Sequence, residues 1–168
     1  MSDKQITDFY RNALGIKTNE KEIYLTAVTH KSYNNSTNNE RLEFLGDAVL
    51  DLIVSQQLFV KNKDASEGFL SIEKSKYVSR ENLNRVAERI LNKNVIKHKS
   101  SYLSKNMLGN TLESIIGAIY IDKGMQACEK FILKHILQVK TEGFLLKNLS
   151  RIINKIFYDK KTKDNRRS

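Results

Sequence analysis

The sequence predicts an all-α domain. The chain contains no proline and only 7 glycines among its 168 residues, so few positions would break a helix. Apolar residues recur at helical spacing through most of the chain, whereas the alternating pattern of half-buried strands is weak. With 40% hydrophobic and 29% charged residues, the composition is that of one globular domain with its own core.

The expected helices follow one another with polar separations. The apolar periodicity predicts helices at residues 6–14, 20–28, 40–60, 67–91, 107–121 and 126–139. Within the fourth, Ser79 marks the place for a break. Gly124 follows the fifth as a glycine C-cap would. Polar loops are expected at residues 34–39, 61–66 and 92–106, the last of them exposed and basic.

The character of the sequence changes after residue 139. Residues 144–158 have the pattern of an amphipathic helix, and residues 160–168 form a basic tail that we expect to be frayed. We therefore expect a folded domain over residues 1–139 and a basic C-terminal helix and tail over residues 140–168.

Charge and composition narrow the class of protein. The formal net charge of +10 favours a polyanionic partner such as nucleic acid, although a lysine-rich solvated surface explains it equally well. No apolar run is long enough to cross a membrane, and the first residues lack the pattern of a signal peptide. The single cysteine, Cys128, is expected in the core. These features favour the cytoplasm or the interior of an organelle.

The helix expected at residues 40–60 carries an acidic stripe. Glu40, Glu43 and Asp47 fall within about 60° of arc on a helix, and Asp51 continues the face. Glu43 and Asp47 repel each other, and hard cations such as Mg²⁺ bind carboxylate oxygens. The pattern therefore favours a metal site. Helix capping and pairing with basic side chains is the alternative, and it explains Glu40 and Glu43 but not Asp47.

The helix expected at residues 107–121 has one charge in its strongly apolar stretch, Glu113, with Asn110 one turn earlier on the same face. Gly109 and Gly117 would let another helix approach closely. A lone buried glutamate pairs more often with a cationic side chain than with a metal ion. Glu113 is therefore a candidate ligand only if this helix packs against the acidic stripe.

Four segments carry a resemblance to a known family. The sequence ERLEFLGDAVL at residues 40–50 resembles the signature of the ribonuclease III family. THKSY at 29–33, EGFLS at 67–71 and GNTLESIIGAIY at 109–120 resemble its other motifs in the same order. The resemblance covers about residues 5–138.

The resemblance implies the ribonuclease III endonuclease domain fold, a homodimeric helical bundle, with residues 1–139 as the catalytic domain. It implies a Mg²⁺-dependent endoribonuclease, in which Mn²⁺ can substitute, that cuts double-stranded RNA during the processing of precursors such as rRNA or mRNA. Two sites along one RNA-binding valley would each cut one strand and leave a short 3′ overhang. The family's usual double-stranded-RNA-binding domain would be absent from residues 140–168.

Single residues inherit roles from the matching motifs. The resemblance assigns catalysis to Asp47 and Glu113, metal binding to Glu43, Asp47, Asn110 and Glu113, accessory acidic roles to Glu40 and Glu67, and a plug in the partner subunit to Phe44. The family usually has aspartate where this chain has Asn110. An amide oxygen still accepts hydrogen bonds, but one negative charge is lost, so we expect weaker metal binding rather than loss of activity.

Two other function classes stay open. A catalytically inactive, ribosome-associated or RNA-binding protein on the same fold is favoured by Asn110 and by the missing second domain, but not by the intact Glu43, Asp47 and Glu113. An acidic-face adaptor without RNA is disfavoured by the net charge. Because metal-assisted hydrolysis needs no histidine base, structural or surface roles are expected of the histidines, His30, His98 and His135.

Overall fold

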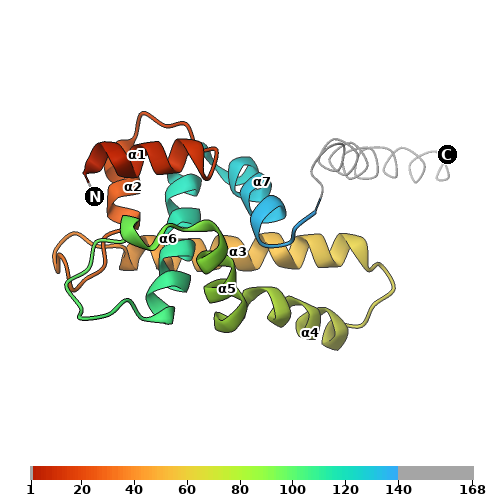
Figure 1. Cartoon of the computed structure of the whole chain (residues 1–168). Coiled ribbons are helices and arrows are strands. Elements are labelled where there is room, and N and C mark those ends of the chain that lie inside the picture. Colours follow the sequence, from red (N-terminus) through yellow and green to blue (C-terminus); the bar gives the residue numbers. More distant parts are fainter. Residues whose placement is uncertain (1, 140–168) are drawn as a thin grey trace. The chain divides into compact units, whose positions relative to one another are not determined.

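The computed structural model describes residues 2–139, and the regular elements of these residues are all helices joined by loops (Figure 1). The elements are α1 (Asp3–Asn12), α2 (Lys21–Ala27), α3 (Glu40–Lys61), α4 (Glu67–Val78), α5 (Arg80–Ile90), the 3₁₀ helix η1 (Lys93–Val95), α6 (Lys105–Lys123) and α7 (Met125–His135). No strand forms within residues 2–139, where Thr29 and Lys97 make an isolated bridge. The all-α prediction is confirmed for these residues.

The chain divides into two compact units, residues 1–137 and 138–168, and the helices named above belong to the first. The predicted amphipathic helix at residues 144–158 and the predicted basic tail lie outside the described residues. Among the described helices, none combines the length and the apolar composition needed to cross a membrane.

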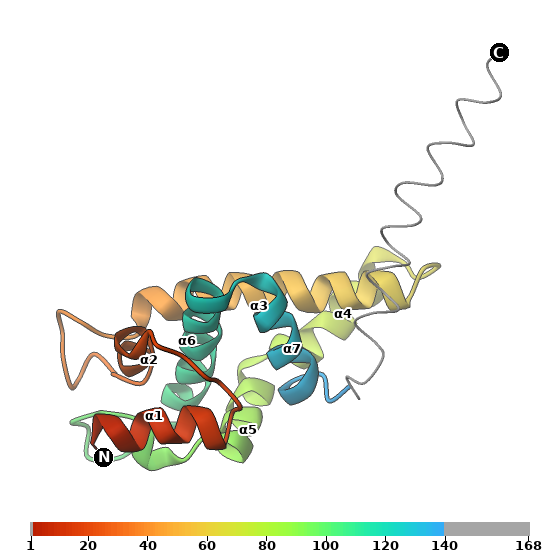
Figure 2. The same ribbon diagram turned by 90° about the horizontal axis from the view of Figure 1, so that it is seen from above.

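Helices α3 and α6 form the centre of the domain. Figures 1 and 2 show α6 crossing α3 in two perpendicular views. From Leu108 to Ile119, every residue of α6 except Asn110 is buried, because the helix contacts α2, α3, α5 and α7. A helix that is apolar on nearly all sides is stable only when it is surrounded in this way.

Serine side chains define where several helices begin. Ser66 accepts a hydrogen bond from the backbone N–H of Phe69 at 3.3 Å and caps α4. Ser79 separates α4 from α5, with its backbone extended and its hydroxyl accepting from the N–H of Asn82 at 3.4 Å. The hydroxyl satisfies a backbone donor that the new helix would otherwise leave free, and the predicted break near Ser79 is confirmed.

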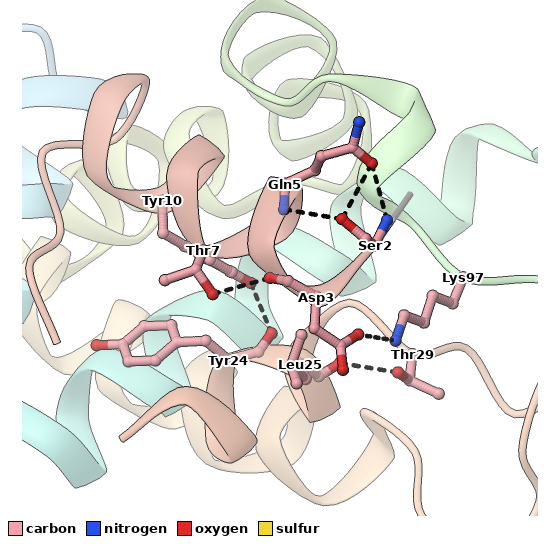
Figure 3. Close-up of polar contacts among 9 residues, drawn as sticks. All are labelled: Ser2, Asp3, Gln5, Thr7, Tyr10, Tyr24, Leu25, Thr29 and Lys97. Atoms are coloured by element: carbon pink, nitrogen blue, oxygen red, sulfur yellow. Dashed lines mark hydrogen bonds and ion pairs between the residues drawn. The ribbon is translucent and has the colours of Figure 1, made fainter. Parts of the chain in front are cut away.

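Polar contacts hold the N-terminal helices in place (Figure 3). Ser2 and Gln5 form a reciprocal capping box at the start of α1. Asp3 pairs with Lys97 at 2.9 Å across 94 residues of sequence. The buried Tyr10 hydroxyl donates to the backbone carbonyl of Tyr24 at 2.9 Å. These contacts connect α1 both to α2 and to the segment that follows η1.

The structure corrects the expected exposed loop at residues 92–106. Its first part forms η1, Val95 and Ile96 are buried in the core, and α6 already begins at Lys105. The backbone of Lys97 donates to Val28 at 2.8 Å and accepts from His30 at 2.9 Å. This pairing draws the segment against the chain after α2 and turns the two aliphatic side chains inward. Helix α7 ends at His135 rather than at residue 139.

Candidate active site at the crossing of α3 and α6

Two glycines bring the backbones of α3 and α6 into direct contact. A Cβ placed on Gly46 would lie 1.8 Å from the carbonyl oxygen of Glu113. A Cβ on Gly117 would lie 2.2 Å from the carbonyl oxygen of Leu42. Any side chain at these positions would therefore force the helices apart. The predicted close approach at Gly117 is confirmed, and it places the acidic stripe of α3 beside Glu113.

Glu113 is the buried acid of this site, with only 5% of its surface exposed. Burial raises the pKa of its carboxyl from the usual 4.5 to about 7, against the opposing effect of the Arg80 guanidinium. The carboxylates of Asp47, Glu43 and Asp51 add to the increase in this pKa. Glu113 was expected to be a candidate metal ligand only if its helix packs against the acidic stripe. The structure shows this packing, because the neighbours of Glu113 are the acids of the α3 stripe.

Glu43 lies in the same electrostatic environment. Burial raises the pKa of its half-buried carboxyl, and the negative charge of Glu40 adds to this increase. The guanidinium of Arg80 and the side-chain amide of Asn110 lower the pKa of Glu43. Glu43 and Glu113 therefore share one cationic neighbour, Arg80.

Arg80 begins α5 and reaches toward α6. Its Nη1 atom lies 3.6 Å from Oε2 of Glu113 and donates a hydrogen bond to Oδ1 of Asn110. This residue was missed by sequence reasoning, because 30 residues separate it from Asn110. One local signal was available: a cation in the first turn of a helix opposes the helix dipole, so its side chain needs an anionic partner.

The outer acids of the stripe have their own partners. Glu40 pairs with Lys31 at 2.8 Å and Asp51 pairs with Lys74 of α4 at 2.8 Å. Asp47 is exposed, and within residues 2–139 no basic side chain lies within ion-pairing distance of it. Pairing with basic residues therefore accounts for Glu40 and Asp51 and leaves Asp47 facing solvent beside Glu113 and Glu43.

The donor chemistry of this cluster fits a divalent cation. The carboxylates that raise the pKa of Glu113 are the groups whose repulsion a cation would relieve. Among residues 2–139, however, no three His, Cys, Asp or Glu side chains converge closely enough to hold an ion. Binding would require the carboxylates of Asp47 and Glu43 to turn toward Glu113, and both lie at least partly at the surface.

Glu67 is not brought to this cluster within one chain. It begins α4, accepts a hydrogen bond from the Ser71 hydroxyl at 2.6 Å, and lines a shallow groove of about 390 Å³ with Gln56 and neighbouring α3 residues. At 1.5 Å of rise per residue, Asp47 and Gln56 lie about 14 Å apart along α3. The accessory role expected of Glu67 stays a prediction.

Phe44 points into solvent. Phe44 is 81% exposed, and Leu52 and Phe59 are also exposed, at 55% and 70%. With Ala48 and Ser55 these residues recur every three or four positions, which places them on one face of α3. Phe69 and Ile72 of α4 add exposed apolar surface, at 45% and 62%. We call these seven residues the α3–α4 apolar stripe.

None of the histidines, nor the cysteine, is among the groups that shift the pKa of Glu113 or Glu43. His135 is buried against the ring of Phe131, and burial lowers its pKa to about 4. Nδ1 of His30 lies 2.9 Å from the Ser32 hydroxyl in the loop between α2 and α3. Cys128 is fully buried and packs in the core, as predicted.

Sequence comparison places this arrangement among known proteins. Residues 20–140 match the protein family described as ribonuclease-III-like. The chain belongs to this family. It is 43% identical to Ribonuclease 3 of Leptospira interrogans and 41% identical to Ribonuclease 3 of Phocaeicola vulgatus, over 137 residues in each case. The matches cover 73% and 77% of this chain but 54% and 44% of those proteins, so the chain spans about half the length of these relatives.

Solved structures of the family have the same fold. The nuclease domain of ribonuclease III from Campylobacter jejuni matches with a TM-score of 0.73 at 33% identity, covering 78% of this chain and 93% of that chain. A second structure of that domain, concerned with flexibility in the region involved in dimer formation, gives a TM-score of 0.71 at 32% identity, covering 79% and 97%. The predicted endonuclease domain fold is confirmed.

Proposed function

We propose that this ribonuclease-III-like domain is a metal-dependent endoribonuclease that hydrolyses phosphodiester bonds in double-stranded RNA. Such an activity would serve RNA processing, for example of rRNA or mRNA precursors, in the cytoplasm or inside an organelle. The observation that carries the proposal is the buried Glu113 carboxyl facing Glu43 and Asp47 across the glycine crossing of α3 and α6. Acids gathered in this way cost stability, and binding of a catalytic cation explains why they are gathered.

The residues of the chain then have separate tasks. Glu113 is fixed in the core by α6 and supplies the immobile carboxylate. Asp47 and Glu43 lie at the rim on α3, where solvent, cation and substrate phosphate can reach them. Asn110 contributes a neutral amide oxygen at the family's usual aspartate position. We propose Glu43, Asp47, Asn110 and Glu113 as the residues that hold the cation, with Asp47 and Glu113 catalytic and Glu40 accessory.

The cation we propose is Mg²⁺, for which Mn²⁺ can substitute. When bound, it would supply Lewis-acid stabilisation of the phosphate and of the leaving oxygen, and it would acidify the attacking water. The protein contributes the position of the carboxylates and the negative field that attracts the ion. The rigid glycine crossing keeps α3 and α6 in register, so that the acids of the two helices stay opposite one another.

The α3–α4 apolar stripe supports a homodimer. Exposed contiguous apolar surface on a globular domain marks an interaction site, and Phe44 and Phe59 are far more exposed than aromatic residues of a monomer usually are. A second copy of the chain would cover the stripe and bring two acidic clusters onto one face. Two clusters on one face could act on the two strands of an RNA duplex, and the net charge of +10 would attract its phosphates.

A second candidate is an RNA-binding or ribosome-associated protein that has lost catalysis. The observation that favours it is the contact of Arg80 with both Glu113 and Asn110, which provides a cation from the protein itself. The absence of three converging ligands within residues 2–139 points the same way. Both candidates bind RNA, so binding and cleavage have to be measured separately.

The experiment combines a gel shift in Ca²⁺ with cleavage in Mg²⁺, using end-labelled duplex RNA, single-stranded RNA and duplex DNA. The wild-type chain is expected to bind and cut duplex RNA alone. Asp47→Asn and Glu113→Gln should bind RNA in Ca²⁺ without cutting it in Mg²⁺. Glu81→Gln removes an acid that is 89% exposed on α5 and should cut at the wild-type rate. Binding without any cutting by the wild-type chain would favour the second candidate, and equal cutting of single strands would contradict the proposed substrate.

A further inference from the structure

Arg80 holds an unusual position for a basic residue. It is the first residue of α5, where a positive charge opposes the helix dipole. Its guanidinium nevertheless turns toward α6, 3.6 Å from the Glu113 carboxylate and hydrogen-bonded to the Asn110 oxygen. Half of the Arg80 side chain is exposed, whereas that of Glu113 is 6% exposed. The contact therefore extends from solvent to a buried acid.

The packing of α5 on α6 fixes this contact. Asn84, one turn after Arg80, is buried and accepts a hydrogen bond from the backbone N–H of Gly109 at 3.1 Å. A Cβ on Gly109 would lie 2.6 Å from the Asn84 oxygen and 3.5 Å from Nη1 of Arg80. The missing side chain at Gly109 thus lets α5 rest on the α6 backbone and leaves space for the guanidinium.

The charges around Arg80 give this placement a consequence. Among the described residues, Arg80 is the one basic residue in ion-pairing distance of Glu113. The lysines near the acidic stripe, Lys31 and Lys74, pair with Glu40 and Asp51 at its two ends. Arg80 also uses the Asn110 oxygen. A divalent cation bound by Glu113 and Asn110 would need the same two oxygens, and two cations cannot share them without strong repulsion.

We propose that Arg80 is an internal counter-cation, which occupies Glu113 and Asn110 in the metal-free protein and must withdraw from them when a divalent cation binds. The inference rests on the proposed function for the identity of the site and adds a regulation to it. Arg80 compensates the buried carboxylate in the absence of metal, and it lowers the affinity of the site for the ion. Removal of the guanidinium should therefore strengthen cation binding and weaken the metal-free fold.

Calorimetric titration of the full chain with Ca²⁺, at constant ionic strength, tests the competition. Arg80→Gln is expected to lower the dissociation constant for Ca²⁺ by about fivefold or more, the lower end of ordinary coupling between sites. Arg85→Gln is the matched control, since Arg85 lies on the same helix, is 69% exposed and pairs only with Glu81 among the described residues. It removes the same charge from the domain, and its Ca²⁺ affinity should stay at the wild-type value.

Urea unfolding in EDTA tests whether Arg80 stabilises the metal-free protein. Arg80→Gln should lower the midpoint, and the same change made in a Glu113→Gln background should lower it less, because the buried carboxylate is gone and only the interactions of Arg80 with Glu43 and Asn110 remain. If Arg80→Gln does not fold, Arg80→Lys replaces it in both measurements. Lysine keeps a charge but cannot bind two oxygens as a planar fork, so Ca²⁺ binding should still be tighter than in the wild type.

The outcomes separate this inference from the proposed function. Wild-type Ca²⁺ binding that depends on Glu113, but is not strengthened by loss of Arg80, overturns the counter-cation and leaves the metal site in place. Failure of both wild type and Arg80 variants to bind Ca²⁺ overturns the competition together with the proposed metal site. Tighter binding by Arg80→Gln, with Arg85→Gln unchanged, supports both.

Discussion

Replacing Glu113 with glutamine should make the metal-free protein more stable, and the gain should grow as the pH rises. Glu113 is 5% exposed, and burial with neighbouring carboxylates raises its pKa from 4.5 to about 7. Between these two values the folded state binds more protons than the unfolded state, so the stability of the wild type falls as the pH rises through this window. The glutamine side chain is neutral at every pH and lacks this loss.

The size of the effect follows from the shift in pKa. With pKa values of 4.5 and about 7, the difference in unfolding free energy between Glu113→Gln and wild type should grow by about 2.5 kcal/mol between roughly pH 5 and pH 8. Most of this increase should be complete near pH 7, where the folded protein releases the proton. Other titrating groups are common to both proteins, and their contributions cancel in the difference.

Urea unfolding followed by circular dichroism in EDTA, at one protein concentration and several pH values, measures this difference. Glu81→Gln is the control, because Glu81 is 89% exposed and its replacement should leave the pH dependence unchanged. A Glu113→Gln difference that is flat across this pH range would show that folding does not raise the pKa of Glu113. It would mean that Glu113 is ionised at no cost, and the electrostatic description of the site would be wrong.

Three further changes test the packing and the site. Phe44→Ala should weaken the proposed homodimer by about 2 kcal/mol, about thirtyfold in dissociation constant. Sedimentation should show this shift, and Tyr102→Ala, which removes another exposed ring, should not produce it. Gly46→Ala places a Cβ 1.8 Å from a carbonyl oxygen of α6 and should lower the free energy of unfolding by about 3 kcal/mol. Gly68→Ala meets open space and should be neutral or stabilising by up to about 1 kcal/mol. Equal melting temperatures for the two variants would contradict the close crossing of α3 and α6. Asn110→Asp should lower the Mg²⁺ concentration needed for cleavage, and a higher requirement would count against a role for this residue in the site.

The features predictable from the sequence are those that depend on local spacing. The acidic stripe followed from the positions of Glu40, Glu43 and Asp47 on one helix, and the break between α4 and α5 followed from the capping preference of Ser79. The sequence did not predict that Glu113 packs against the acidic stripe. It indicated only that Glu113 could be a metal ligand if this packing occurred. The packing occurs because Gly46 and Gly117 lie opposite one another, a match between two helices that neither helix specifies alone.

Features that depend on tertiary contacts were not predictable in this way. The contact of Arg80 with α6 arises from the packing of α5, which is fixed by the bond from Gly109 to Asn84. The burial of Val95 and Ile96 depends on the backbone pairing of the following residue with the chain after α2. Both cases left a local signal, a cation at a helix start and an aliphatic pair in a polar segment. Neither signal identifies the residues that these side chains contact.

We propose that the acids at the crossing of α3 and α6 would hold the cation needed for cleavage of duplex RNA. The most direct test is the initial rate of duplex RNA cleavage as a function of Mg²⁺ concentration, measured for the wild type and for Glu113→Gln. We expect a rate that rises with Mg²⁺ and saturates in the wild type, and no cleavage by Glu113→Gln at any concentration, although its RNA binding in Ca²⁺ is unchanged. A Glu113→Gln variant with the wild-type rate and Mg²⁺ dependence would show that Glu113 does not hold the cation.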